Sequence, residues 1–162
     1  MFDKRLGEVS AVVDPAATEG DAGLVFIGRI RTAWKTLDDC PKNPKEARLR
    51  DVPAVLEIDD AWRPALRGLE PGQQVHVLYW MGEARRDLVV LHPSHKPSPV
   101  GAFALRSPAR PNPIALSLVR ILSLDEAAGR LEIDAIDCLD GTALLDIKPW
   151  IETVDAPGRQ GG

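Results

Sequence analysis

Short apolar runs separated by turn-forming residues dominate the chain and predict a structure rich in β-strand. The runs are five to nine residues long and rich in Val, Ile, Leu and aromatic residues, as strands are. The run at 130–136 alternates apolar Leu131 and Ile133 with acidic Glu132 and Asp134, as a strand with one buried face does. The predicted strands are residues 24–30, 52–58, 75–81, 87–91, 100–105, 114–122 and 130–136.

The spacing of these strands favours an antiparallel barrel or sandwich over alternating strands and helices. We therefore expect an all-β fold with little helix, in the form of a compact antiparallel β-barrel that is not of the Rossmann type. Residues 59–69 are the best helix candidate, although Pro64 must kink or shorten that helix. Residues 38–51 are polar, contain two prolines and are predicted to form a long surface loop. Asp140 and Gly141, between apolar runs, predict a two-residue hairpin turn.

The length of 162 residues predicts one domain with its own core. Residues 1–22 are expected to be a flexible leader, 23–153 the barrel and 154–162 a disordered tail. No apolar run approaches the roughly 20 residues of a membrane span, and the beginning of the sequence lacks a signal-peptide core. Cys40 and Cys138 have no metal-type spacing. A cytoplasmic protein with free thiols is therefore the expectation.

The net charge of −4 argues against a general nucleic-acid binder, but the charges are unevenly distributed. Residues 84–124 carry six basic side chains and one acid, whereas residues 125–155 carry nine acids and two basic side chains. Such a distribution suits a protein that docks a phosphate backbone on one side. The outer arginines are equally compatible with a solvated face that has no partner. They are Arg85, Arg86 and Arg120.

The segment RSPARPNPI, residues 106–114, is the strongest candidate for a binding site. Each of its three prolines fixes its own φ and drives the preceding residue into an extended conformation. The stiff loop therefore holds Arg106, Arg110 and Asn112 in set directions. A segment that only turned the chain would need no pair of guanidinium groups.

A second candidate site is the acidic segment IDAIDCLDGTALLDIKPWI, residues 133–151. Its aspartates repel one another unless a cation or a ligand offsets their charge, and ligand hydroxyl and amino groups are suitable partners. Asp140 and Gly141 could also serve only to turn the chain, and Trp150 could be either core or a stacking surface. The aspartates are Asp134, Asp137, Asp140 and Asp146.

Several familiar motifs are absent from the sequence. No GxGxxG or GxxxxGK[ST] motif indicates a nucleotide-phosphate loop. His92 and His95 are separated by Pro93, which prevents the helical geometry of a zinc pair, and we expect no metal site. Ser107 lacks a GxSxG context, so acyl transfer is not indicated.

Together, the runs FALRSPARPNPIALSLVRI (103–121) and DCLDGTALLDIKPWI (137–151) resemble the TsaA-like (YaeB, TrmO) family. The resemblance covers roughly residues 24–153. It implies a small TsaA-like β-barrel and an S-adenosylmethionine-dependent tRNA methyltransferase. The implied substrate is the N6 position of threonylcarbamoyladenosine at position 37, in the anticodon loop. A homodimer with the cofactor near the subunit interface is also implied. The C-terminal domain of longer members is expected to be missing.

The resemblance also implies the roles of individual residues. Arg106 matches an arginine that lines the cofactor pocket, and Leu116 matches a cofactor-contacting position. Three departures from the family pattern are mild: Ala115 replaces Gly, Ala143 replaces Pro and Trp150 replaces Tyr. Further implied cofactor-binding residues are Asp134, Ala135, Ile136 and Asp137 on the adenosine-holding strand, Pro41, Lys42 and Asn43 in place of a Pro-Arg-Gln stretch, and Gly82 and Glu83 in place of a His-containing pair.

Methyl transfer from a sulfonium is an in-line displacement in which the protein mainly aligns donor and acceptor. It also needs a group that takes the proton from the attacking amine. Asp137 and Asp140 are the predicted proton acceptors, and Arg106 is expected to offset carboxylate or phosphate charge. The residues expected to contact tRNA are Arg110, Asn112 and Lys148.

Two functions from other classes remain open. One is a regulatory or altered-substrate relative that binds S-adenosylmethionine. The other is a nucleic-acid-binding barrel without catalysis. Calorimetry with S-adenosylmethionine separates the binding barrel from the rest, and single-turnover assays separate the regulator from an enzyme.

Overall fold

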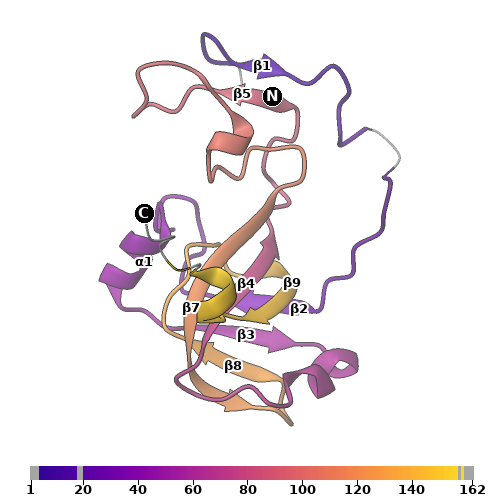
Figure 1. Cartoon of the computed structure of the whole chain (residues 1–162), viewed down its shortest axis with the longest axis vertical. Helices are drawn as coiled ribbons and strands as arrows, with labels where there is room; N and C mark the ends of the chain where they lie inside the picture. Colours follow the sequence, from indigo (N-terminus) through magenta and orange to yellow (C-terminus); the bar gives the residue numbers. More distant parts are fainter. Residues whose placement is uncertain (1–3, 18–19, 157, 159–162) are drawn as a thin grey trace. The chain divides into compact units, whose positions relative to one another are not determined.

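A closed barrel of strands forms the larger part of the structure (Figure 1). The computed structural model describes residues 4–17, 20–156 and 158. Within these residues six strands close in the order β2-β3-β8-β7-β4-β9, and β2–β3, β2–β9, β3–β8 and β7–β8 pair antiparallel. The barrel strands are β2 (Gly28–Arg31), β3 (Ala54–Ile58), β4 (Gln74–Trp80), β7 (Ile114–Asp125), β8 (Arg130–Ile133) and β9 (Thr142–Pro149). The predicted mostly-β fold with an antiparallel barrel is confirmed.

The barrel interior is filled by alternate residues of each strand, because successive side chains of a strand point to opposite faces. On β4 the buried residues are Val75, Val77 and Tyr79. The apolar residues that are fully or almost fully buried on the other strands are Ile30, Leu56, Ile121, Leu131, Ile133 and Leu144. Burying each such side chain stabilises the fold by about 1.5–3 kcal/mol.

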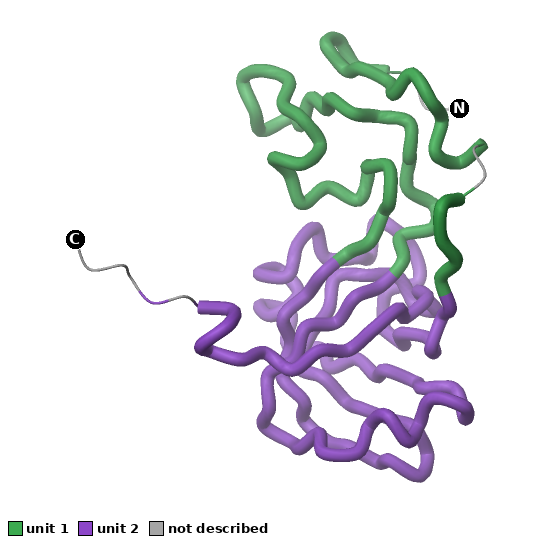
Figure 2. Tube along the Cα trace, turned by 45° about the vertical axis from the view of Figure 1, so that its right-hand side comes forward, with its two compact units in different colours: residues 1–24, 80–115 green, residues 25–79, 116–162 purple. Residues whose placement is uncertain are grey.

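The chain divides into two units, which Figure 2 colours separately. Unit 1 comprises residues 1–24 and 80–115, and unit 2 comprises residues 25–79 and 116–162. In unit 1, β5 (Leu88–Leu91) lies between β1 (Val9–Ser10) and β6 (Val100–Gly101). A 3₁₀ helix, η2 (Ala102–Ala104), follows β6. Unit 2 holds most of the barrel.

The two segments expected to lack regular structure, residues 1–22 and 154–162, each contain some of it. Val9 and Ser10, in the segment expected to be a flexible leader, form β1 and pair with β5. The Ser10 hydroxyl donates to Asp87 (3.1 Å), which fixes this pairing. In the expected tail, Val154 and Asp155 belong to helix α2 (Glu152–Asp155). Residues 1–3, 18–19, 157 and 159–162 lie outside the described residues.

The prediction of a loop over 38–51 is wrong, because α1 (Pro44–Arg50) lies within it. Asn43 caps this helix, and its side-chain oxygen accepts a hydrogen bond from the Glu46 amide at 2.9 Å. Glu46 in turn accepts from the Lys42 amide at 3.1 Å, and Pro44 occupies the first turn, where it has no unpaired amide. The two prolines thus bound a helix start rather than a loop.

Two further predictions need correction. The strand predicted over 100–105 ends at Gly101, because Leu105 donates to the Ala102 carbonyl and closes η2. Asp140 and Gly141 do form a tight turn, with Gly141 at φ 81°. The turn is not a hairpin, since β8 pairs with β3 and β7 whereas β9 lies between β4 and β2.

The helix predicted over 59–69 is the 3₁₀ helix η1 (Asp60–Leu66), with Pro64 inside it. The helices of the described residues are all short. None of them has the length and apolar content that crossing a membrane requires.

Asn43→Ala is expected to lower the free energy of unfolding by about 1 kcal/mol, because the cap of α1 is lost. Asn43→Ser, which keeps a capping oxygen, serves as the control and should stay close to the unchanged protein. Urea unfolding measures both. Equal stability of the two variants would contradict a capping role for Asn43.

Candidate functional site

Three polar side chains meet in unit 2, and we call them the Asp137 cluster: Tyr79, Ser117 and Asp137. Tyr79 comes from β4, Ser117 from the neighbouring strand β7, and Asp137 from the connection between β8 and β9. The Tyr79 and Ser117 hydroxyl oxygens are 3.0 Å apart. Tyr79 donates to the Asp137 carboxylate at 3.2 Å. Both hydroxyl-bearing residues are only 3% exposed, whereas Asp137 is half-buried.

The environment of Asp137 favours a proton-accepting carboxylate. Burial raises the pKa of Asp137 above its ordinary value, although its own backbone amide, Tyr79, Arg48 and Ser117 all oppose this rise. Burial and the Asp137 charge raise the pKa of Tyr79, so the phenol stays protonated and remains a donor. A carboxylate with a raised pKa is a stronger base than an exposed one.

The backbone around Asp137 is held in place by hydrogen bonds. The Asp134 carboxylate accepts from the amides of Arg120 (2.9 Å) and Ala135 (3.0 Å). Ile136 is buried, and its carbonyl accepts from the Trp34 indole nitrogen at 3.1 Å. Residues 134–137, predicted to be an adenosine-holding strand, are not a strand, because β8 ends at Ile133. They form a hydrogen-bonded segment with Asp137 as its half-buried acid.

The start of α1 lies beside the Asp137 cluster. The charge of Asp137 adds to burial in raising the pKa of the Cys40 thiol, and Arg48 of α1 donates to the Leu118 carbonyl of β7 at 2.8 Å. Of the predicted cofactor residues here, Pro41 is buried and Lys42 is exposed. The side chain of Asn43 is used by the helix cap.

Asp140, the other predicted proton acceptor, is held in a different way. Its carboxylate accepts from Lys35 (2.7 Å) and from the Thr32 amide (3.1 Å). Lys35, the Thr32 amide and the charge of Arg31 hold the pKa of Asp140 below its usual value. Asp140 is therefore a weaker base than Asp137, and it braces the turn before β9.

In unit 1, the two arginines of the proline loop have different surroundings. Arg110 is half-buried, and its guanidinium donates to the carbonyls of Leu105 (3.1 Å) and Ser107 (3.3 Å). Arg106 is exposed and makes no hydrogen bond or ion pair with any described residue. Arg110 shapes the loop, while Arg106 is available to a ligand.

The other predicted contacts in unit 1 surround Trp80. Arg86 lies over the Trp80 ring at 5.5 Å and donates to the Asn112 side chain at 3.4 Å. Gly82 and Glu83 follow β4 and are exposed. A Cβ on Gly82 would lie 3.2 Å from the Trp80 ring.

Two more predicted contact residues lie in unit 2, Lys148 for tRNA and Leu116 for the cofactor. Lys148 pairs with Asp146 at 2.8 Å near the end of β9, and both side chains are exposed. Leu116 is 40% exposed near the start of β7. Sequence reasoning missed Tyr79 and Ser117, which are polar residues at inward positions of otherwise apolar strands.

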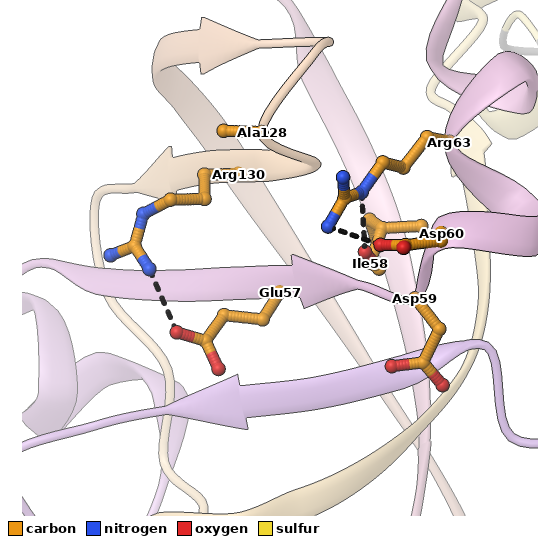
Figure 3. Close-up of a pocket in the computed structure, with 7 residues that line it drawn as sticks. All are labelled: Glu57, Ile58, Asp59, Asp60, Arg63, Ala128 and Arg130. Carbon is orange, nitrogen blue, oxygen red and sulfur yellow. Dashed lines mark hydrogen bonds and ion pairs between the residues drawn. The ribbon is translucent and has the colours of Figure 1, made fainter.

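A surface pocket of about 540 Å³ lies away from the Asp137 cluster, where β3 ends and β8 begins (Figure 3). Its charges are paired with one another: Arg130 with Glu57 at 2.8 Å, and Arg63 with Asp60 at 2.5 Å. None of the predicted site residues lines it. We therefore place the candidate site at the Asp137 cluster.

Comparison with known proteins decides the family. Residues 29–156 match the model of the tRNA-methyltransferase O N-terminal domain. The chain belongs to the TrmO family. A solved structure described as TrmO is 31% identical, with a TM-score of 0.67, and the match covers 88% of this chain and 64% of that one. TrmO from Pseudomonas aeruginosa is also 31% identical, with a TM-score of 0.64, covering 88% and 62%.

Curated TrmO-family relatives are named for their ligand. "Probable S-adenosyl-L-methionine-binding protein VirR" of Rhizobium radiobacter is 44% identical over 131 residues, which are 81% of this chain and 72% of that protein. An S-adenosyl-L-methionine-binding protein of Archaeoglobus fulgidus is 34% identical over 136 residues, covering 84% and 94%. This chain thus spans most of these relatives, but less than two thirds of the solved TrmO chains.

The Asp137 cluster is chemically compatible with the adenosine part of the ligand that these TrmO-family relatives are named for. Ribose hydroxyls and an adenine amino group need hydrogen-bond acceptors. Asp137 is a half-buried carboxylate, and Ala135 and Ile136 give it a buried, apolar support. A partly desolvated acceptor binds such donors more strongly than an exposed one.

Proposed function

We propose that this protein binds S-adenosylmethionine and transfers its methyl group to N6 of threonylcarbamoyladenosine at position 37 of tRNA. Family membership carries the proposal, because the matching domain is that of a tRNA methyltransferase. The half-buried Asp137 carboxylate, with its raised pKa, supports it from the structure. Nothing in this chemistry requires a metal.

The proposed reaction is a balanced displacement. The methyl–sulfur bond of the sulfonium breaks, a methyl–nitrogen bond forms, and the nitrogen loses one proton. Asp137 holds adenosine hydroxyls, or takes that proton, and Asp140 braces the adjoining turn through Lys35 and Thr32. Arg106, whose guanidinium pairs with none of the described residues, offsets a carboxylate or phosphate charge.

Three residues are proposed to contact the tRNA, and their side chains differ in how free they are to do so. Asn112 is exposed, so its amide can read an adenine edge. Lys148 must exchange Asp146 for a phosphate. Arg110 acts chiefly by shaping the loop that presents Arg106.

Mass spectrometry of tRNA nucleosides tests the substrate. A strain that lacks this gene is expected to lose methylated threonylcarbamoyladenosine and to keep the unmethylated form. Complementation with the intact gene should restore the methylated nucleoside, and complementation with Asp137→Asn should not. An unchanged nucleoside profile in the deletion strain would reject this substrate.

A second candidate is a regulatory protein that binds S-adenosylmethionine without methylating tRNA. One observation favours it: the relatives are named as S-adenosyl-L-methionine-binding proteins. Both candidates bind the cofactor in calorimetry. Only the enzyme converts bound cofactor to S-adenosylhomocysteine when modified tRNA is added.

A further inference from the structure

The Tyr79 and Ser117 hydroxyls lie where the barrel interior is otherwise apolar. On β4, Tyr79 continues the inward row of Val75 and Val77. On β7, Ser117 is likewise two residues before inward Val119. Ser117 and Tyr79 are each only 3% exposed, so both hydroxyls are buried. These two hydroxyls replace the apolar groups that the alternation predicts.

Buried hydroxyls are unfavourable unless they are hydrogen-bonded. Phe in place of Tyr79, or Ala in place of Ser117, would fill nearly the same space without a polar atom. The polar side chains therefore do not serve packing alone. Within the described residues, their side-chain hydrogen-bond partners are each other and the Asp137 carboxylate.

Both hydroxyls act on the Asp137 carboxylate. A phenol has one proton, and Tyr79 donates it to Asp137 at 3.2 Å. The Ser117 hydroxyl oxygen lies 3.0 Å from that of Tyr79, and Ser117 also favours the charged form of Asp137. Linked hydrogen bonds inside a protein strengthen one another.

We propose that Tyr79 and Ser117 are positioning residues that keep the Asp137 carboxylate charged and in one orientation toward the bound nucleoside. The role rests on the proposed function, since the nucleoside is its object. Without the two donors, desolvation would favour the protonated acid, which is a poorer acceptor for hydroxyl and amino groups. Two buried residues of the barrel thus set the charge and orientation of Asp137, which lies in the connection between β8 and β9.

The other groups around Asp137 come from three segments. Arg48 of α1 favours the charged carboxylate. Cys40, before α1, and Cys138, next in the chain, have thiol pKa values raised mainly by burial. Both thiols are neutral over the range in which the carboxylate titrates. Arg48 is unchanged in the variants below, so a shift reports the hydroxyls.

Tyr79→Phe is expected to raise the pKa of Asp137 by about one unit, because a hydrogen bond to a charged group is lost. Carbon-13 NMR of the aspartate carboxyl carbons measures this, with Asp137→Asn assigning the resonance. Ser117→Ala should shift the pKa in the same direction by less, and Ser117→Thr should restore it. The midpoint of S-adenosylmethionine binding against pH, followed by calorimetry, should move upward with the pKa.

Val77→Ala is the matched control, since it removes buried atoms from the same inward row of β4 without removing a hydroxyl. It should lower stability and leave the Asp137 pKa and the binding midpoint where they were. An Asp137 pKa unchanged in Tyr79→Phe would overturn the positioning role. So would a raised pKa that the binding midpoint does not follow. If the unchanged protein binds no S-adenosylmethionine, the proposed function is rejected. The NMR titration still shows separately whether the two hydroxyls lower the pKa of Asp137.

Discussion

Asp137→Asn should weaken S-adenosylmethionine binding by about 10- to 100-fold, the range expected when a hydrogen bond to a charged acceptor is lost. The amide keeps an oxygen that can accept from Tyr79, so the fold is expected to survive. It carries no charge and cannot take a proton. Turnover with modified tRNA should therefore fall further than binding if Asp137 is the proton acceptor. Calorimetry and a single-turnover assay measure the two effects separately.

The same substitution on β9, Asp146→Asn, is the control for Asp137→Asn. It breaks an exposed pair with Lys148, and such pairs contribute little. In the unchanged protein, binding should also weaken as the pH falls through the raised pKa of Asp137, and Asp137→Asn should lose that dependence. Equal affinity of Asp137→Asn and the unchanged protein would exclude Asp137 from the site.

Arg106→Ala should reduce methyl transfer roughly 100-fold or more, through loss of charge-assisted hydrogen bonds to a ligand carboxylate or phosphate. Its stability should stay within about 0.5 kcal/mol of the unchanged protein, because Arg106 has no hydrogen bond or ion pair within the described residues. Arg106→Lys keeps the charge without the planar fork and should be intermediate. Methyl transfer from labelled cofactor and urea unfolding measure the two properties.

Arg110→Ala separates a ligand-binding arginine from a loop-shaping one. It removes two hydrogen bonds to the carbonyls of Leu105 and Ser107, so it should lower stability as well as activity. Near-normal turnover of Arg106→Ala would rule out its catalytic role. Equal stability losses for the two variants would show that Arg106 also holds the loop.

The barrel could be predicted from the sequence because its signal is local. The alternation of β4 and β8 follows from the two faces of a strand, and both strands lie within one residue of where the pattern begins them, although β8 ends at Ile133 and not at residue 136. Which strands lie next to each other depends on residues that are far apart in the sequence. Asp140 and Gly141 look like a hairpin, but the partners of β8 and β9 are set by barrel closure, which no short window of sequence contains.

The errors at α1 and η2 both arise from weighing composition above local signals. Asn43, Pro44 and Glu46 together form a helix-start signal, which the polar composition of 38–51 outweighed. Residues 100–105 are apolar and strand-like, yet Phe103 is 86% exposed and the backbone turns into η2. Composition alone therefore misassigned both segments.

Asp137 and Arg106 could be named as candidate residues from the sequence, whereas the side chains that support Asp137 could not. Asp137 and Arg106 stand in long motifs that carry the family resemblance. Tyr79 and Ser117 lie in strands whose sequences look like ordinary apolar core. The one signal for them is that a polar residue stands at a position where the alternation predicts a buried side chain. The sequence shows that Asp134 and Asp140 are carboxylates, but only the fold shows their hydrogen bonds to backbone amides and to Lys35.

A single-turnover experiment tests the central claim most directly. Purified protein in excess is mixed with methyl-labelled S-adenosylmethionine and tRNA that carries threonylcarbamoyladenosine, and the nucleosides are analysed by mass spectrometry. We expect the label in methylated threonylcarbamoyladenosine, with S-adenosylhomocysteine formed in equal amount and much less of both products from Asp137→Asn. Tight binding of the cofactor with no label in the tRNA would contradict the account and leave a binding protein.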